Sequence, residues 1–222
     1  MKIIAHRGFS SDYPENTLLA FTKALEAGAD GIETDLQLSR DEAIILFHDD
    51  TLKQITKAEG TPQEHTLAEL KRLDAGRGEG IPTLDELLRL CNAKATLILE
   101  IKYDPGTYKR LCELTAEHIA EMSEWVEVSC FEDRVLEYIH ELAPQIRIHK
   151  LIDKVSTLTD KAFENRYTYV SYFDISVKLR KTVMQMSLLQ RHKVIFWTVK
   201  DEDLIQETAA GLYGIMRDDP TL

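Results

Sequence analysis

The chain has 222 residues, of which 38 are acidic and 27 are basic, so its net charge at pH 7 is −11. This acidic balance disfavours a nucleic-acid-binding protein, which needs a basic face, while the length is enough for one sizeable core. No apolar run reaches the length of a membrane span, and the first strand reaches His6 too soon for a secretory signal peptide.

Strand-like runs alternate with helical patterns, which predicts an α/β fold in a single domain over residues 1–222. The first strand covers residues 2–5, and the next helix has Asn16 or Thr17 as its N-cap and ends at Gly28. Further strands are predicted at 31–38, 43–48, 97–102, 125–131, 146–152, 168–173, 193–199 and 213–216, with helices at 84–91, 108–122, 132–142, 183–191 and 203–209. This order favours a TIM-type (βα)8 barrel over a doubly wound sheet.

The alternation breaks near the second and third strands. Only residues 39–42 separate them, whereas a parallel crossover needs about a dozen residues or more. The sequence therefore predicts an antiparallel hairpin or an irregular excursion here, and not a full helix between Asp35 and Ile44. The polar residues 51–80 follow directly, with one short helical piece at 67–73, and we expect a small insertion or lid over the barrel mouth.

Acidic side chains gather at two strand ends. Because side chains alternate across a strand, Glu33 and Asp35 point to the same side about 7 Å apart, and the same parity pairs Glu100 with Lys102. Three carboxylates without a zinc-type Cys or His pattern select a hard cation, Mg²⁺ or Ca²⁺. The alternative is that these acids pair with Lys or Arg inside the barrel. Two strand ends sharing the pattern, with histidines beside them, favour the metal.

Two histidines also end strands. Each of His6 and His48 alone is more often structural, but a pair at strand ends suits proton transfer near neutral pH. Arg7 and Lys102 would supply positive charge for an anionic group, or else form ion pairs with the carboxylates. A metal, two histidines and two cations around one cavity suit the hydrolysis of a phosphodiester.

These residues match a known family. The sequence resembles the glycerophosphodiester phosphodiesterases in its HRG at His6, IETD at Glu33 and FHDD at His48. The match continues in order through PENT, GADGIE, IPTLDELL, LEIK, SCF, FWTV and GIMRDDP. So many ordered matches are far more specific than one short motif.

The resemblance implies a phospholipase-C-like TIM barrel that converts glycerophosphodiesters to glycerol 3-phosphate and an alcohol, through attack by the substrate's own glycerol hydroxyl and a cyclic phosphate. It assigns the divalent cation to Glu33, Asp35 and Glu100, acid-base catalysis to His6 and His48, phosphate contact to Arg7 and Lys102, and the substrate wall to Trp197. Trp197 is alternatively a large core aromatic. Glu15 either orients Arg7 or approaches the metal as an outer acid.

Three departures from the family pattern are Asp41-Glu42 at an Asp-Gly turn, Cys130 where Ser is common and Arg217 where Thr is usual; the last two bear on head-group preference.

Rival interpretations are a lysophospholipase D or sphingomyelinase D-like lipid phosphodiesterase, which the polar segment 51–80 weakens, and a non-catalytic phosphate-binding barrel. The cysteines are odd in number and widely spaced, which predicts reduced buried thiols. With no signal peptide or membrane span predicted either, we expect a cytoplasmic protein. The sequence leaves the head group, Mg²⁺ against Ca²⁺ and the oligomeric state open.

Overall fold

The computed structural model describes residues 1–159, 163–186, 188–200 and 211–221. Eight parallel strands form a closed barrel, because β1 pairs with both β2 and β9 and the remaining strands join those two in sequence order. The predicted TIM-type (βα)8 barrel is confirmed. The strands are β1 (Lys2–His6), β2 (Gly31–Leu38), β4 (Thr96–Ile101), β5 (Val126–Cys130), β6 (Arg147–Ile152), β7 (Tyr172–Ser176), β8 (Lys193–Trp197) and β9 (Gly214–Arg217).

The ninth strand, β3 (Ile44–Leu46), lies outside this pattern. It runs antiparallel to the end of β2, with Leu38 opposite Ile44. A tight turn joins the two strands, in which the Ser39 amide donates to the Ala43 carbonyl and Glu42 takes a φ of +61°. The predicted hairpin is confirmed. Glu42 stands where the family resemblance implies a glycine, and it takes the left-handed backbone that glycine adopts more easily.

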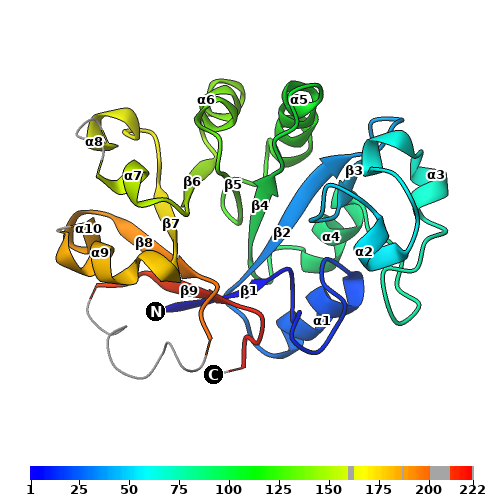
Figure 1. Ribbon diagram of the computed structural model, residues 1–222, viewed down its shortest axis with the longest axis horizontal. Coiled ribbons are helices and arrows are strands. Elements are labelled where there is room, and N and C mark those ends of the chain that lie inside the picture. Colours follow the sequence, from blue (N-terminus) through cyan, green and yellow to red (C-terminus); the bar gives the residue numbers. More distant parts are fainter. Residues whose placement is uncertain (160–162, 187, 201–210, 222) are drawn as a thin grey trace.

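Helices surround the strands (Figure 1). They are α1 (Leu18–Glu26), α4 (Leu84–Cys91), α5 (Tyr108–Ile119), α6 (Asp133–Leu142), α7 (Val155–Leu158), α8 (Phe163–Arg166), the 3₁₀ helix η2 (Val177–Leu179), α9 (Arg180–Gln185) and α10 (Leu188–Arg191). The predicted helix at 183–191 is therefore two short helices, while the one predicted at 203–209 lies outside the described residues. Within the described ranges, no helix is long and apolar enough to cross a membrane.

One predicted strand is misplaced. The strand expected at 168–173 begins only at Tyr172, after a turn in which the Val170 amide donates to the Tyr167 carbonyl. The Tyr169 ring stacks on His140 of α6, with ring centroids 5.1 Å apart. The alternating apolar residues before β7 therefore pack against a helix. In the sequence this alternation cannot be distinguished from that of a strand.

Side-chain parity separates an inner from an outer core. Outward-facing strand residues such as Ile32, Leu36 and Leu99 pack with the helices, where burying each such side chain contributes about 1.5–3 kcal/mol. A smaller apolar cluster, which includes Ile98 and Ile195, fills the barrel interior. The inward-facing residues above this interior cluster are polar, which places charged groups at the carboxyl ends of the strands.

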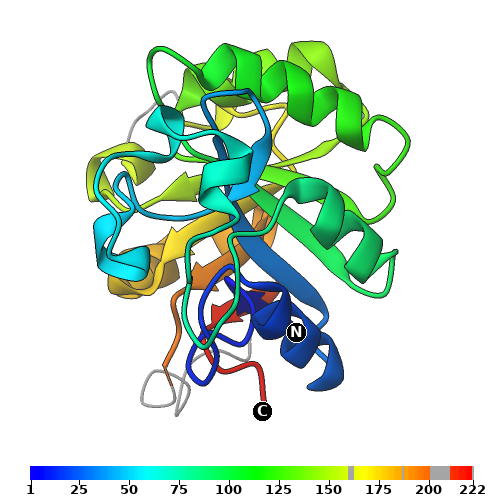
Figure 2. The same cartoon turned by 90° about the vertical axis from the view of Figure 1, so that its right-hand side faces the viewer.

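Residues 51–80 form the small insertion, which is the expectation from the sequence. It contains α2 (Lys53–Thr56), the 3₁₀ helix η1 (Pro62–Glu64) and α3 (Leu67–Leu70), of which only a longer version of α3 was predicted. The insertion has its own apolar cluster, built with residues of the β3 segment: Ile45, Phe47, Leu52, Leu70, Ala75 and Ile81. Figure 2 shows this cyan segment in front of the blue strands β2 and β3.

Candidate active site

Three carboxylates converge where β2 and β4 end. One oxygen from each of Glu33, Asp35 and Glu100 lies within 4.8 Å of the other two. Asp35 is opposite Glu100 in the strand register, and the two β2 acids are buried. The shared orientation that strand alternation predicts for Glu33 and Asp35 is present in the structure.

Two cations face these acids. Lys102 Nζ lies 3.0 Å from Glu100 Oε1 and 3.1 Å from Asp35 Oδ1. Arg7 Nε lies 3.4 Å from Asp35 Oδ2, and its Nη1 donates to Glu15 Oε1 at 3.0 Å. The ion pairs considered from the sequence therefore exist. They do not balance the cluster, because two cations face four carboxylates.

The excess negative charge affects the carboxyl pKa values. Burial, together with the charges of Asp35 and Glu100, raises the pKa of Glu33 well above its usual range. Burial and the Asp35 charge likewise raise the pKa of Glu100 to about 7, even though Lys102 opposes this. Burial also acts to raise the pKa of Asp35, but Lys102 and Arg7 outweigh it and lower that pKa to about 2.

These residues fit a hard divalent cation. All three donors are carboxylate oxygens, and Mg²⁺ or Ca²⁺ binds such oxygens at about 2.0–2.6 Å, so two ligands of one ion lie up to about 4–5 Å apart. The separations within the cluster fall in this range. Asp35 Oδ1 is also a buried oxygen without a well-aligned hydrogen bond, despite the nearby Lys102 ammonium. A bound cation would relieve the repulsion that raises the pKa values of Glu33 and Glu100.

The HRG turn after β1 is shaped around Glu33. Arg7 has a φ of +56°, and its backbone amide donates to Glu33 Oε2 at 3.1 Å. Gly8 follows with a φ of +83°, and a Cβ there would lie 2.7 Å from the backbone carbon of Ala20 in α1. Only glycine fits this approach. The left-handed turn fixes the Glu33 carboxylate and sends the Arg7 side chain towards Asp35.

Asn16 holds Asp35 and does not cap α1. The N-cap is Thr17, whose Oγ1 accepts a hydrogen bond from the Ala20 amide. Asn16 is buried, its Nδ2 donates to Asp35 Oδ2 at 2.8 Å, and its Oδ1 accepts from Thr34 Oγ1 at 2.7 Å. The explanation of Asn16 as a helix cap is therefore wrong, because its side chain reaches the carboxylate cluster instead of the first turn of the helix.

Glu15 pairs with Arg7 at 3.0 Å, which agrees with the first of its two expected roles. Its carboxylate is partly exposed, and the group of three converging oxygens is formed by Glu33, Asp35 and Glu100.

Each strand-end histidine has a carboxylate partner at Nδ1. His6 Nδ1 lies 2.7 Å from Asp218 Oδ1, and Ser10 Oγ is within hydrogen-bonding distance of the same oxygen. His48 Nδ1 lies 2.8 Å from Asp49 Oδ1. A carboxylate at Nδ1 fixes the ring orientation and leaves Nε2 for a substrate.

Sequence reasoning did not assign these two carboxylates. Asp49 was visible only as the neighbour of His48 in FHDD. Asp218 lies 212 positions from His6. The sequence feature that could have indicated it is the acidic pair after the last strand, which begins two residues beyond the inward-facing Met216.

Trp197 ends β8 and lies beside the interior apolar cluster. Its ring contacts Phe131 edge to face at 5.7 Å, and its Nε1 donates to the Asp174 carbonyl. The ring is partly exposed, so it can serve both as a packing aromatic and as part of a wall. Cys130 and Arg217 are buried on the outward-facing sides of their strands. The Cys130 thiol donates to the Ile101 carbonyl, so Cys130 belongs to the outer core.

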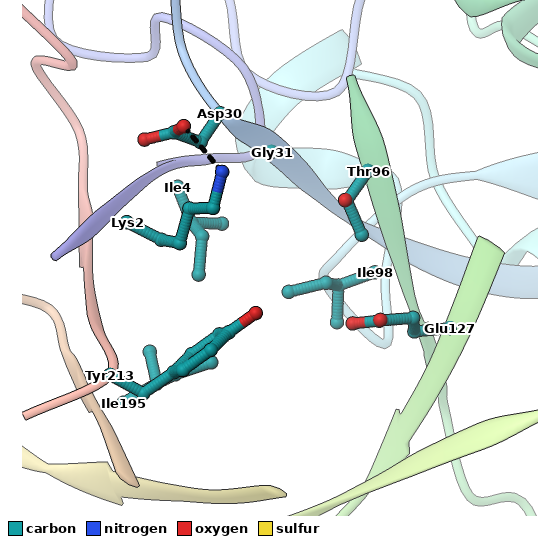
Figure 3. A pocket seen from close by; sticks show the side chains of 9 residues that line it. All are labelled: Lys2, Ile4, Asp30, Gly31, Thr96, Ile98, Glu127, Ile195 and Tyr213. Atoms are coloured by element: carbon teal, nitrogen blue, oxygen red, sulfur yellow. Dashed lines mark hydrogen bonds and ion pairs between the residues drawn. The ribbon is translucent and has the colours of Figure 1, made fainter. Parts of the chain in front are cut away.

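A cavity of about 30 Å³ lies at the other end of the barrel (Figure 3). Lys2 and Asp30 form an ion pair at its edge, with Nζ 2.8 Å from Oδ1, and Tyr213 and Glu127 line it. In TIM barrels the amino ends of the strands serve stability and the carboxyl ends carry catalysis. This small cavity is therefore not the catalytic site.

Known proteins share this sequence and fold. The profile of the glycerophosphoryl diester phosphodiesterase family matches residues 6–222. A glycerophosphodiester phosphodiesterase of Caldanaerobacter subterraneus subsp. tengcongensis is 36% identical over 235 residues, which cover 98% of this chain and 94% of that protein. The putative glycerophosphodiester phosphodiesterase YhdW of Bacillus subtilis is 33% identical, covering 99% of this chain and 95% of that protein.

A solved structure agrees. The phosphodiesterase of Oleispira antarctica in complex with the product sn-glycerol-3-phosphate superposes with a TM-score of 0.86 and 28% identity, covering all of this chain and 94% of the other. The barrel, the order of the motifs and these relatives lead to one assignment. The chain is a phosphoric diester hydrolase that belongs to the glycerophosphoryl diester phosphodiesterase family.

Proposed function

We propose that the protein hydrolyses glycerophosphodiesters to glycerol 3-phosphate and an alcohol by divalent-metal-dependent, two-histidine catalysis. The observation that carries this proposal is the convergence of three carboxylates, two of them buried, at 4.8 Å or less beside two carboxylate-bonded histidines. The product bound to the Oleispira antarctica phosphodiesterase supports glycerol 3-phosphate as the product here.

The proposed ligands of the cation, Mg²⁺ or Ca²⁺, are Glu33, Asp35 and Glu100. When bound, the ion neutralises negative charge on the phosphate oxygens. Asn16 holds the Asp35 carboxylate, and the Arg7 amide holds that of Glu33, so both ligands are oriented before the cation arrives.

The proposed phosphate contacts are Arg7 and Lys102. Both side chains are anchored to the cluster, Arg7 between Glu15 and Asp35 and Lys102 between Asp35 and Glu100. Burial alone would lower the pKa of Lys102, but Asp35 and Glu100 outweigh it and raise that pKa, so its ammonium stays charged throughout the physiological pH range. Two fixed cations can therefore hold the diester with its phosphorus near the histidines. Trp197 is the proposed wall of the substrate site.

The proton transfers belong to His6 and His48. Nε2 of one ring takes the proton from the glycerol hydroxyl as its oxygen bonds to phosphorus. Nε2 of the other ring gives a proton to the alcohol oxygen as the bond from phosphorus to that oxygen breaks. A cyclic phosphate results, and water opens it with the two proton transfers reversed. Asp218 and Asp49 stabilise the imidazolium formed at each step.

Purified protein with glycerophosphocholine and Mg²⁺ or Ca²⁺ tests the proposal by the release of glycerol 3-phosphate. We expect activity that EDTA abolishes, that the added ion restores, and that the double change His6→Ala, His48→Ala eliminates. His118→Ala is the matched control, because His118 lies on α5 and bonds to the Leu114 carbonyl. Activity that survives both EDTA and the double change would refute the mechanism.

The rival lipid phosphodiesterase makes a separate prediction in the same assay. Lysophosphatidylcholine would then be cleaved in preference to glycerophosphocholine. The insertion argues against this activity, because its apolar side chains are buried in its own cluster with the β3 segment.

All three cysteines are buried free thiols, which is consistent with the cytoplasmic location that we propose.

A further inference from the structure

A cavity of about 350 Å³ opens between the insertion and the loop after β4. This volume is within the range of about 300–1,000 Å³ that is typical of small-molecule sites. Thr61 and Gln63 line it from the insertion, and Tyr103 and Asp104 line it from the loop. The cavity therefore lies at the carboxyl ends of the strands, on the catalytic side of the barrel.

Lys102 joins this cavity to the catalytic cluster. The residue lines the cavity, while its Nζ contacts Asp35 and Glu100 at 3.1 and 3.0 Å. If Lys102 contacts the phosphate, the cavity begins next to phosphorus and extends away from the carboxylates. It thus has the position required for one of the two substituents of a phosphodiester.

The walls of the cavity carry unbalanced negative charge. Asp50 and Asp104 both line it, and the Lys102 charge is already shared by the carboxylates of Asp35 and Glu100. Asp104 is held in place, since its Oδ1 accepts hydrogen bonds from the Gly106 amide and from Thr107 Oγ1, each at 2.9 Å. A fixed carboxylate loses little freedom when it attracts a cation.

An aromatic wall accompanies these acids. The Tyr103 ring lines the cavity and packs beside Tyr108 with ring centroids 5.3 Å apart, and it also contacts the Arg134 guanidinium, 5.5 Å from its centroid. The opposite wall is fixed by Gln63 Nε2, which donates to Gln37 Oε1 and ties the insertion to β2. Carboxylates with an aromatic ring form the kind of surface that recognises an ammonium group.

We infer that this cavity binds the leaving alcohol of the substrate and selects alcohols that carry an ammonium group over uncharged polyols. The inference rests on the proposed function and adds the head-group class, which the sequence leaves open. Asp50 and Asp104 are the selecting residues. Because Asp50 is exposed and solvent screens its charge, the expected preference is on the order of tenfold rather than larger.

The test compares kcat/KM for glycerophosphoethanolamine and glycerophosphocholine with that for glycerophosphoglycerol, whose head group is uncharged. For the wild type we expect a ratio of about ten in favour of the two ammonium substrates, lowered by added salt. Asp104→Asn and Asp50→Asn should each reduce this ratio by about threefold, mainly through KM. Asparagine keeps the oxygen that the Asp104 loop bonds require, and the ratio within one variant is independent of how much protein is folded.

Asp74→Asn is the matched control. The Asp74 carboxylate also accepts hydrogen bonds from loop amides, those of Gly76 and Gly78, but it does not line the cavity. It should leave the ratio unchanged. Equal kcat/KM values for all three substrates, or a ratio that Asp104→Asn and Asp50→Asn do not change, would overturn the inference while the proposed function stands. Hydrolysis of none of the three would overturn the proposed function and the inference together.

Discussion

At the scale of single residues, the site depends on side chains that support others. Asn16 holds Asp35, the Arg7 amide holds Glu33, and Asp218 holds His6. Such supporting contacts commonly change metal affinity or activity by about 10–100-fold when they are lost. They are difficult to predict from sequence, because a short polar residue near a helix start is most often a cap, and Asn16 and Thr17 are the two N-cap positions predicted here.

Asp218→Asn should lower kcat by about 10–100-fold with little change in KM. The asparagine keeps the size of the side chain but removes the negative charge beside His6 Nδ1, which in the proposed mechanism stabilises the imidazolium. Asp219→Asn is the control, since among the described residues Asp219 accepts hydrogen bonds from Thr221, two positions further along the chain. Equal kcat values for the two variants would show that the contact between Asp218 and His6 does not support catalysis.

Metal affinity should depend on pH through Glu100. Its pKa is raised to about 7 in the metal-free cluster, so below this pH a cation must displace a proton to bind. The metal concentration for half-maximal activity should therefore rise as the pH is lowered from 8 to 6, and isothermal titration should detect proton release. Glu100→Gln should weaken binding far more than Glu117→Gln on the exposed face of α5. Comparable losses in the two variants would count against the three-carboxylate site.

At the scale of elements, the sequence predicted most of what strand alternation and loop length determine. The shared face of Glu33 and Asp35 follows from the two-residue period, and the β2–β3 hairpin follows from a connection too short for a crossover. The prediction of a strand at 168–173 was wrong at its start, because the residues around Tyr169 have a strand-like pattern but Tyr169 packs on helix α6. The helices α2 and η1 in the insertion were missed, because a helix of four residues or fewer has too few turns for a periodicity.

The turn after β1 gives a prediction about stability. Gly8→Ala should destabilise the fold by about 2 kcal/mol or more, because it adds a left-handed strain and a Cβ at 2.7 Å from the Ala20 backbone. Gly28→Ala shares the positive φ, at +79°, but its Cβ would meet open space, so it should cost about 1 kcal/mol. Urea unfolding of both variants measures the difference. A Gly28 variant as unstable as the Gly8 variant would mean that the close approach to α1 contributes nothing.

At the scale of the whole molecule, a buried ionic cluster joins three neighbouring strands of the barrel. His149 on β6 is fully buried, with Nδ1 2.9 Å from an oxygen of Asp174 on β7 and Nε2 2.7 Å from Glu127 on β5. The Tyr172 ring stacks on the imidazole at 4.3 Å. Burial alone would lower the pKa of His149, but the two carboxylates outweigh it and raise that pKa to about 9.

This cluster should make stability depend on pH. Because the folded pKa of His149 exceeds its unfolded value of 6.5, the stabilisation is complete below pH 6.5 and is lost as the pH rises through about 9. The loss is up to about 3 kcal/mol by linkage. Urea unfolding at pH 6.5 and pH 9 measures it, and His149→Gln should be less stable at pH 6.5 and should flatten this part of the profile. A wild-type profile that is flat between pH 6.5 and 9 would contradict the assignment.

The contact between His6 and Asp218 has a consequence for biosynthesis. Asp218 is made 212 positions after His6. The two meet only when β9 pairs with β1 and closes the barrel. In the proposed mechanism, a nascent chain that still lacks β9 therefore carries all three proposed metal ligands and both histidines without the carboxylate that supports His6, so it is not yet fully competent towards the diesters around it.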